Sequence, residues 1–173
     1  MNSTHQNVKK LTVTALLLAM NIIMSMSMFS LPVPGGHMYL NDVVICTAAI
    51  LLEPFYAFLV GGVGAFIGDM LFYPPPMFVS LAAHGLQALI ISICTRRLIK
   101  GTRELSSVVG CAIGLVVSVI LYSLGRAYVY STPAYAVMKL PFQILQTLLG
   151  SAAALLLCWK CGIVKIYEKM FKQ

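Results

Sequence analysis

Polar side chains that can hold a small organic molecule recur at regular spacing in a very apolar chain. His84 and Gln87 stand three residues apart, and Gln143 and Gln146 repeat that spacing. Residues three apart lie on one side of an α-helix, so each pair presents two polar groups in one direction. Imidazole and carboxamide groups both donate and accept hydrogen bonds, which is the chemistry of reversible recognition.

Further candidates for the same binding chemistry carry a charge or an aromatic ring. They are Asp42, Asp69, Tyr122, Arg126, Lys139 and, in the segment after the first apolar run, His37. Both signs of charge are present, which favours a small neutral or zwitterionic ring bearing hydroxyl groups. A bare metal ion would need clustered carboxylates or histidines. We therefore expect no metal and no cofactor.

The composition is that of a membrane protein. Of the 173 residues, 60% are hydrophobic and 10% are charged, and the mean hydropathy is +0.90. Soluble domains carry roughly 25% charged residues, so this chain lies well outside their range. Apolar runs recur along nearly the whole length, and we expect residues 1–173 to form a single integral membrane domain surrounded by lipid.

The net charge of +7 does not indicate a nucleic-acid partner. The basic residues stand at the ends of the apolar runs and form no stripe interleaved with aromatic residues, as nucleic-acid binding would need. Lysine and arginine accumulate instead on the cytoplasmic side of membrane proteins. We therefore interpret these residues as setting the orientation of the chain in the membrane.

A transmembrane α-helix needs about 20 apolar residues. The long apolar stretch from Val43 to Phe72 is interrupted at Glu53-Pro54, where proline lacks an amide donor and clashes with the preceding turn. Two helices in this stretch place the main basic clusters and both termini on the cytoplasmic side. The predicted fold is an all-α bundle of six transmembrane helices, with approximate spans 11–31, 42–53, 55–72, 76–95, 105–128 and 140–159.

This topology places the candidate binding residues in the outer half of the membrane. An ionisable side chain in hydrocarbon costs several kcal/mol unless it faces protein or water, so these residues must face the bundle interior. The inner halves of the spans are almost entirely apolar. We expect a cavity open to the outside and closed beneath, with Gly125 to Gln146 forming a lid loop and the two helix ends that it joins.

Several motifs along nearly the whole chain resemble those of S components, the substrate-binding subunits of energy-coupling factor (ECF) vitamin transporters. The first helix carries AxxxA at Ala15 and Ala19, and later segments read PGGHMYLND, VGGVGAFIGDML, YPPPMFVSLAAHGLQ and KLPFQILQTLLG. The pattern is most similar to S components assigned to hydroxymethylpyrimidine and vitamin B6 (pyridoxine) uptake. That resemblance implies a ligand-contacting role for His84, Gln87 and Gln146.

The resemblance also implies how the chain works. An S component of the cell membrane captures its vitamin outside, and an ECF coupling transmembrane subunit with two ATPases drives uptake. Ala15 and Ala19 would form the face that docks on the coupling subunit. No GxxxxGK[ST] phosphate loop occurs in this sequence, so energy must come from such partners, and we do not expect an enzyme.

Two other classes of protein remain open from the residues. A stand-alone secondary transporter or channel should carry carboxylates near mid-membrane, for which Glu53 and Asp69 are the candidates. An intramembrane hydrolase is less favoured: Ser80 and His84 have the i, i+4 spacing of a nucleophile and base, without GxSxG or an oxyanion site. Cys158 and Cys161 form a CxxC that lacks a second ligand pair.

Overall fold

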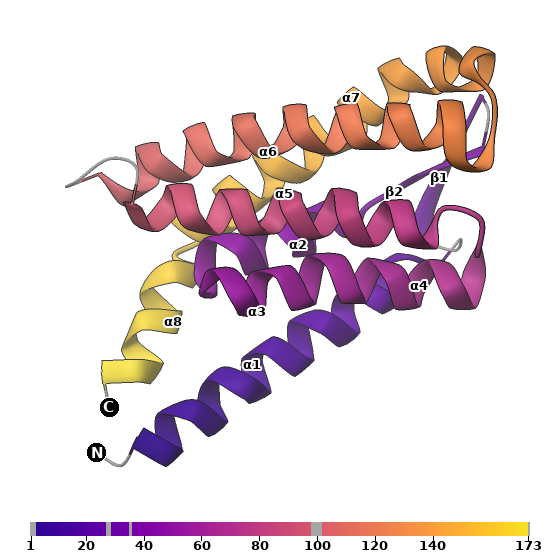
Figure 1. Ribbon diagram of the computed structural model, residues 1–173. Helices are drawn as coiled ribbons and strands as arrows, with labels where there is room; N and C mark the ends of the chain where they lie inside the picture. The colour runs from indigo at the N-terminus through magenta and orange to yellow at the C-terminus, as the bar shows by residue number, and fades with distance from the viewer. Residues whose placement is uncertain (1–2, 27–28, 35, 98–101, 173) are drawn as a thin grey trace.

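The computed structural model describes residues 3–26, 29–34, 36–97 and 102–172, and it is a bundle of helices with one small hairpin (Figure 1). The helices are α1 Ser3–Met24, α2 Asn41–Leu51, α3 Pro54–Phe58, α4 Gly64–Phe72, α5 Met77–Arg97, α6 Arg103–Gly125, α7 Pro133–Leu155 and α8 Ile163–Lys172. Three π-helical segments extend or join them: η2 Leu59–Val63, η3 Arg126–Tyr130 and η4 Leu156–Lys160.

Among the described residues, five helices are long and apolar enough to cross a membrane. They comprise His5–Met24, Pro54–Phe72, Met77–Arg97, Arg103–Tyr130 and Pro133–Lys160. The remaining predicted span, 42–53, corresponds to α2, which has only 11 residues and rises about 16 Å, near half of a bilayer core. The six-span count and the cytoplasmic position of the termini therefore stay predictions, although both termini lie at one end of the bundle in Figure 1.

The short helix α2 lies at the centre of the bundle and contacts α1, α5 and α7. Nearly all of its residues are buried, and Ile45, Cys46 and Ile50 belong to the main apolar core. Because α2 is surrounded by protein, its length need not match the bilayer. Its position decides where the polar residue at its first turn, Asp42, is held.

Polar side chains satisfy the carbonyl groups at the C-terminal end of α2. Ser92 Oγ donates to the carbonyl of Leu52 at 2.7 Å, and Arg96 Nη2 donates to that of Leu51 at 2.7 Å. The last carbonyls of a helix have no partner within the helix, so such contacts replace water there. These contacts allow the C-terminal end of α2 to be buried without unpaired carbonyl groups at Leu51 and Leu52.

The first helix ends at Met24, so the prediction that it extends to Leu31 is wrong. Ser30–Val33 (β1) and Gly36–Tyr39 (β2) instead pair as an antiparallel hairpin, with Ser30 opposite Tyr39. Pro32 has a fixed φ and no amide donor, which disfavours a helix interior. Gly36 has φ +124°, a conformation that other residues rarely adopt. The hairpin adds a small β element to the predicted all-α fold.

The residues between the predicted spans 105–128 and 140–159 were expected to form a loop, but they are almost entirely helical, and the last long helix begins before Leu140. The helix α6 continues as η3 to Tyr130, and α7 begins at Pro133. Thr132 caps α7 by accepting a hydrogen bond from the amide of Tyr135 at 3.3 Å, and proline suits the first helical position. The connection is therefore a tight turn at Ser131 and Thr132, shorter than the predicted lid loop.

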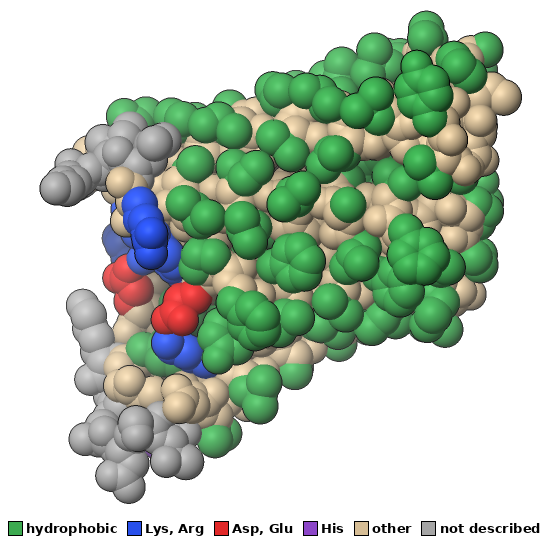
Figure 2. Space-filling model, viewed as in Figure 1, with side chains coloured by type: hydrophobic (Ala, Val, Ile, Leu, Met, Phe, Trp, Pro, Cys, Tyr) green, Lys and Arg blue, Asp and Glu red, His purple; other side chains and the backbone are tan. Residues whose placement is uncertain are grey.

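Charged side chains gather at one end of the face shown in Figure 2, the end at which both termini lie. The remainder of this face is covered by hydrophobic side chains. Lys10 and Glu53 form an ion pair of 2.5 Å at this end. An apolar surface with charges confined to one end is typical of a bundle that lies within a bilayer.

Candidate ligand-binding cavity

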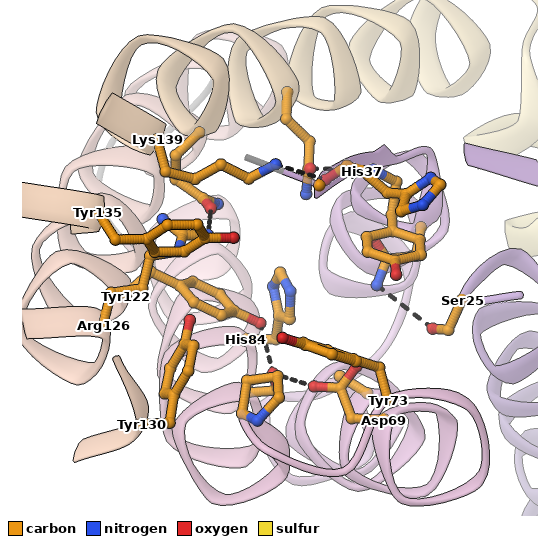
Figure 3. Close-up of a pocket in the computed structure, with 18 residues that line it drawn as sticks. Ser25, His37, Asp69, Tyr73, His84, Tyr122, Arg126, Tyr130, Tyr135 and Lys139 are labelled. Atoms are coloured by element: carbon orange, nitrogen blue, oxygen red, sulfur yellow. Dashed lines mark hydrogen bonds between the residues drawn. The ribbon is translucent and has the colours of Figure 1, made fainter. Parts of the chain in front are cut away.

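A cavity of about 190 Å³ opens at the hairpin end of the bundle, opposite the two termini (Figures 1 and 3). Its wall is formed by β2, the start of α2, α4, the first half of α5, the α6–η3 junction and the first half of α7. Segments from the whole sequence therefore meet around one space.

Eight of the residues predicted to bind the ligand line this cavity. Four come from the middle of the chain: Asp69, His84, Tyr122 and Arg126. The other four are His37 of the hairpin and Lys139, Gln143 and Gln146 of α7. The remaining two predicted residues, Asp42 and Gln87, are fully buried and lie behind the wall, where they support the residues that line it.

The buried carboxylate of Asp42 organises the floor of the cavity. Gln87 donates from Nε2 to Oδ1 at 3.1 Å, and Gln146 donates from Nε2 to Oδ2 at 2.8 Å. Asp42 is 0% exposed, and a buried carboxylate without such partners would be strongly disfavoured. The two amides therefore hold Asp42 and are themselves held in fixed orientations.

This network also shows that the Nδ1 atom of His84 carries a proton. Since the Gln87 amide nitrogen donates to Asp42, its Oε1 faces the imidazole and accepts a hydrogen bond from Nδ1 at 2.9 Å. Nδ1 therefore carries a proton, and it also lies 3.8 Å from Asp42 Oδ1. No described residue forms a hydrogen bond with Nε2, so this nitrogen is available to a ligand.

A chain of hydroxyl groups lines the side of the cavity near α4. The Tyr122 hydroxyl donates to Ser80 Oγ at 2.6 Å, and Ser80 Oγ donates to Asp69 Oδ2. The Tyr122 ring also meets the His84 ring edge to face, with 5.1 Å between centroids. The hydrogen bond to Ser80 and the ring contact with His84 thus hold Tyr122 in place, which gives the cavity a rigid aromatic wall.

Two basic side chains line the part of the wall formed by η3 and α7. The Arg126 guanidinium stands 5.2 Å from the Tyr122 ring centroid, and its Nη2 donates to Gln143 Oε1 at 2.5 Å. Lys139 Nζ donates to the backbone carbonyl of His37 at 2.9 Å. Neither forms an ion pair with a described residue. Arg126 therefore contacts an aromatic ring and an amide, and Lys139 holds the hairpin against α7.

The hairpin covers part of the cavity and is tied to α7. The Tyr39 amide donates to Gln146 Oε1 at 3.0 Å, beside the contact between Lys139 and His37. Burial raises the pKa of the Tyr39 hydroxyl, and the charge of Asp69 raises it further. Tyr39 therefore stays neutral and can donate a hydrogen bond at physiological pH.

The sequence reasoning missed several residues of the wall. Ser25, Tyr39, Asn41 and Tyr135 all line the cavity. Tyr135 falls in the segment taken as a loop, and Ser25 follows a helix that was expected to continue to Leu31. Period-three spacing identifies residues on one long helix, whereas these four lie beside helix ends or in the hairpin. Figure 3 shows Tyr73, Tyr122, Tyr130 and Tyr135 around His84, so the wall is more aromatic than predicted.

The pair predicted for a hydrolase does not form. Ser80 Oγ donates to Asp69 and accepts from Tyr122, while His84 Nδ1 pairs with Gln87. The serine therefore has no hydrogen bond to the histidine that would have to activate it. Within the described ranges, no group of three or more potential metal-ligating side chains occurs, and Cys158 is buried while Cys161 is exposed.

Ala15 and Ala19, the predicted docking residues, are both exposed on α1. The opposite side of this helix packs through Asn21, whose Nδ2 donates to the Val60 carbonyl at 2.6 Å, near Gly64. The alanines are thus free of contacts that hold the bundle together. Whether a partner covers them stays a prediction.

An apolar helical bundle with a polar cavity at one end is typical of membrane proteins that take up small molecules. A family model described as the S component of the ECF-type riboflavin transporter matches residues 5–162. The chain belongs to this family of S components. It is a multi-pass protein of the cell membrane and a substrate-binding subunit for vitamin uptake, and family membership implies a small-molecule substrate and ECF partner subunits.

Two relatives are each 30% identical to this chain over about 70% of its length. The thiamine precursor transporter HmpT of Lactococcus lactis subsp. cremoris is 30% identical over 127 residues, covering 71% of this chain and 75% of HmpT. A Pyrococcus woesei protein, described as an uncharacterized protein in a gap 3' region, is 30% identical over 123 residues. The alignment covers 69% of this chain and 80% of that protein. The predicted S component is therefore confirmed at the level of the family.

Proposed function

We propose that this protein captures a single-ring vitamin precursor of the hydroxymethylpyrimidine or pyridoxine type from outside the cell. An ECF coupling subunit with two ATPases would then drive its uptake. The observation that carries the proposal is the small cavity of about 190 Å³ with hydrogen-bonding groups on an aromatic wall. The similarity to HmpT supports a thiamine precursor as the ligand.

The size of the cavity favours one ring over several. An engineered protein cavity of about 150 Å³ accepts benzene, and pockets for drug-sized molecules span roughly 300–1,000 Å³. A pyrimidine or pyridine with short substituents falls in the lower range. Riboflavin has three fused rings and a ribityl chain, so it would require the hairpin or the tyrosines to move.

The chemistry of the wall also matches a substituted heteroaromatic ring. In its neutral form His84 offers Nε2 as an acceptor for an amino or hydroxyl group, and the tyrosines of the wall offer aromatic surfaces to a ring. Lys139 provides a donor for a ring nitrogen or a hydroxyl oxygen. In this proposal Asp42 and Gln87 act on the ligand indirectly, by orienting His84 and Gln146.

Riboflavin is the second candidate ligand, because the matching family model describes a riboflavin transporter. Calorimetric titration of the purified protein with hydroxymethylpyrimidine, pyridoxine, thiamine and riboflavin, without ATP, separates the candidates. We expect one of the two single-ring compounds to bind most tightly. Tight riboflavin binding with no single-ring binding would overturn the proposed ligand.

A matched pair of histidine variants places the binding event in the cavity. His84→Leu should weaken binding at least tenfold, since it removes the acceptor and the contact with Gln87. His5→Leu, the same change at an exposed position on α1, should bind like the unmodified protein. Equal behaviour of the two variants would exclude the cavity as the site.

A stand-alone transporter differs from this proposal in its need for partners. Liposomes that contain this chain alone should bind the ligand but accumulate none of it, with or without a proton or sodium gradient. Gradient-driven accumulation would support the secondary-transporter alternative instead.

A further inference from the structure

The C-terminal helix α8 forms a second feature, far from the cavity, at the end of the bundle where both termini lie (Figure 1). It follows Gly162, whose φ of +77° allows the chain to turn away from the axis of α7. One side of α8 packs on the bundle: Val164 is buried, and Ile163 and Tyr167 contact the apolar core. The helix is therefore part of the folded structure.

Two polar contacts fix the rotation of α8 about its own axis. Arg103 of α6 forms an ion pair of 2.6 Å with Glu168, and Lys9 of α1 donates to the Met170 carbonyl at 2.9 Å. Together with buried Val164, these contacts determine which side chains face away from the bundle.

The side that faces away combines basic and apolar residues. Lys165 and Lys169 are exposed and stand four residues apart, so they lie one turn above the other. Ile166 is 62% exposed and Met170 is 39% exposed, and they form a parallel apolar row. Exposed apolar side chains beside lysines are the pattern of a helix lying in the membrane interface, where apolar groups enter the acyl region and lysines reach the headgroups.

The charges around this face are unbalanced. Lys160, which precedes α8, is exposed like Lys165 and Lys169, and none of the three has an ion pair among the described residues. Nearby acids are engaged elsewhere: Glu53 pairs with Lys10 and Glu168 pairs with Arg103. Glu104 begins α6. Three free cations therefore surround an apolar row.

We propose that the outward face of α8 and the preceding Lys160 bind the headgroups of anionic phospholipids. The residues of this surface are Lys160, Lys165, Ile166, Lys169 and Met170. Ile166 and Met170 insert between the acyl chains, and the lysines contact the phosphate groups. Each basic residue near an anionic bilayer strengthens association by about fivefold at ordinary salt. The interaction anchors the termini end of the bundle in the membrane surface.

The single tryptophan of the chain, Trp159, provides a built-in probe because it directly precedes Lys160. The full-length protein is placed in nanodiscs of equal amounts of phosphatidylglycerol and phosphatidylcholine, with brominated acyl chains on only one of the two lipids at a time. Bromine quenches tryptophan fluorescence at short range, and the lipid composition is otherwise unchanged. We expect about twofold stronger quenching when phosphatidylglycerol carries the bromine, and a smaller difference at high salt.

Lysine variants test whether this preference arises from α8. A triple variant should make the two quenching values equal; it combines Lys160→Gln, Lys165→Gln and Lys169→Gln. Changing the same three positions to Arg should keep the difference, because the positive charges remain. Arg97→Gln, a single change at an exposed basic residue on α5, should also keep it. Equal quenching in the unmodified protein, or a preference that survives the triple Gln variant, would overturn the inference.

Discussion

Gln146 of α7 donates from Nε2 to Oδ2 of Asp42 at 2.8 Å, although the two residues are 104 positions apart in the chain. The carbonyl of the same amide accepts from the Tyr39 backbone at 3.0 Å. One side chain therefore joins α7, the buried helix α2 and the hairpin. The position of the hairpin over the cavity depends on this residue.

Replacing Gln146 with Leu should loosen the hairpin and weaken ligand binding. The change leaves the Tyr39 amide and one oxygen of Asp42 without their partners, and each loss of this kind costs about 1–3 kcal/mol. We expect at least a tenfold rise in the dissociation constant by calorimetry and faster hydrogen exchange in β2. Leu145→Ala, at the neighbouring exposed position, should change neither measurement.

Gly150→Ala should weaken the packing of α2 against α7 and destabilise the protein. A Cβ atom at Gly150 would clash with the Asp42 side chain and lie 3.0 Å from its backbone carbonyl carbon. Overpacking of this kind costs about 1–3 kcal/mol, and here it also displaces the carboxylate that orients Gln87 and Gln146. Thermal unfolding in detergent should shift to lower temperature while Ala152→Val, on the exposed side of α7, leaves it unchanged.

Variants of Tyr122 can separate the contribution of its ring to ligand binding from that of its hydroxyl group. Tyr122→Phe removes the hydrogen bond to Ser80 but keeps the contacts with His84 and Arg126, so affinity should fall about two- to tenfold. Tyr122→Leu loses the aromatic contacts as well and should fall further. If both variants bind equally weakly, the ring does not act as the proposed aromatic wall.

Arg103 should stabilise the protein more than its ion pair alone accounts for. It binds Glu168 and also donates from Nη2 to the Ile50 carbonyl at 3.0 Å. Glu168→Gln removes only a partly exposed ion pair, worth about 0.2–1 kcal/mol. Arg103→Met also leaves a carbonyl of α2 unpaired, worth about 1–3 kcal/mol more, and should lower the unfolding temperature further. Similar shifts for the two variants would show that the carbonyl contact is unimportant.

Ala15→Trp tests docking separately from binding. Ala15 is exposed on α1 and distant from the cavity, so ligand affinity of the purified protein should be unchanged. Uptake by cells that also express the ECF partner subunits should be abolished, because a large side chain prevents close helix approach. Val116→Trp, at a 53% exposed position on α6, should leave uptake intact. Equal loss of binding and uptake by Ala15→Trp would contradict a separate docking face.

Much of the architecture follows from the sequence, because long apolar helices carry strong local signals. Apolar runs near 20 residues predicted the five long helices, and Pro54 marked the break after α2. Helix ends were less predictable. The first helix was expected to reach Leu31 and the last to begin at Leu140, because apolar composition alone does not distinguish a hairpin or a capped helix start from its neighbours.

The sequence by itself also determined which polar side chains had to face the interior, since hydrocarbon disfavours exposed ionisable groups. Only the tertiary structure decided their separate roles. Asp42 and Gln87 lie behind the wall, whereas His84 and Gln146 line it, and Ser25 and Tyr135 join them from segments without periodic spacing. These roles depend on how helices distant in the chain pack together, and a buried carboxylate must find its partners across that packing, whatever their distance in sequence.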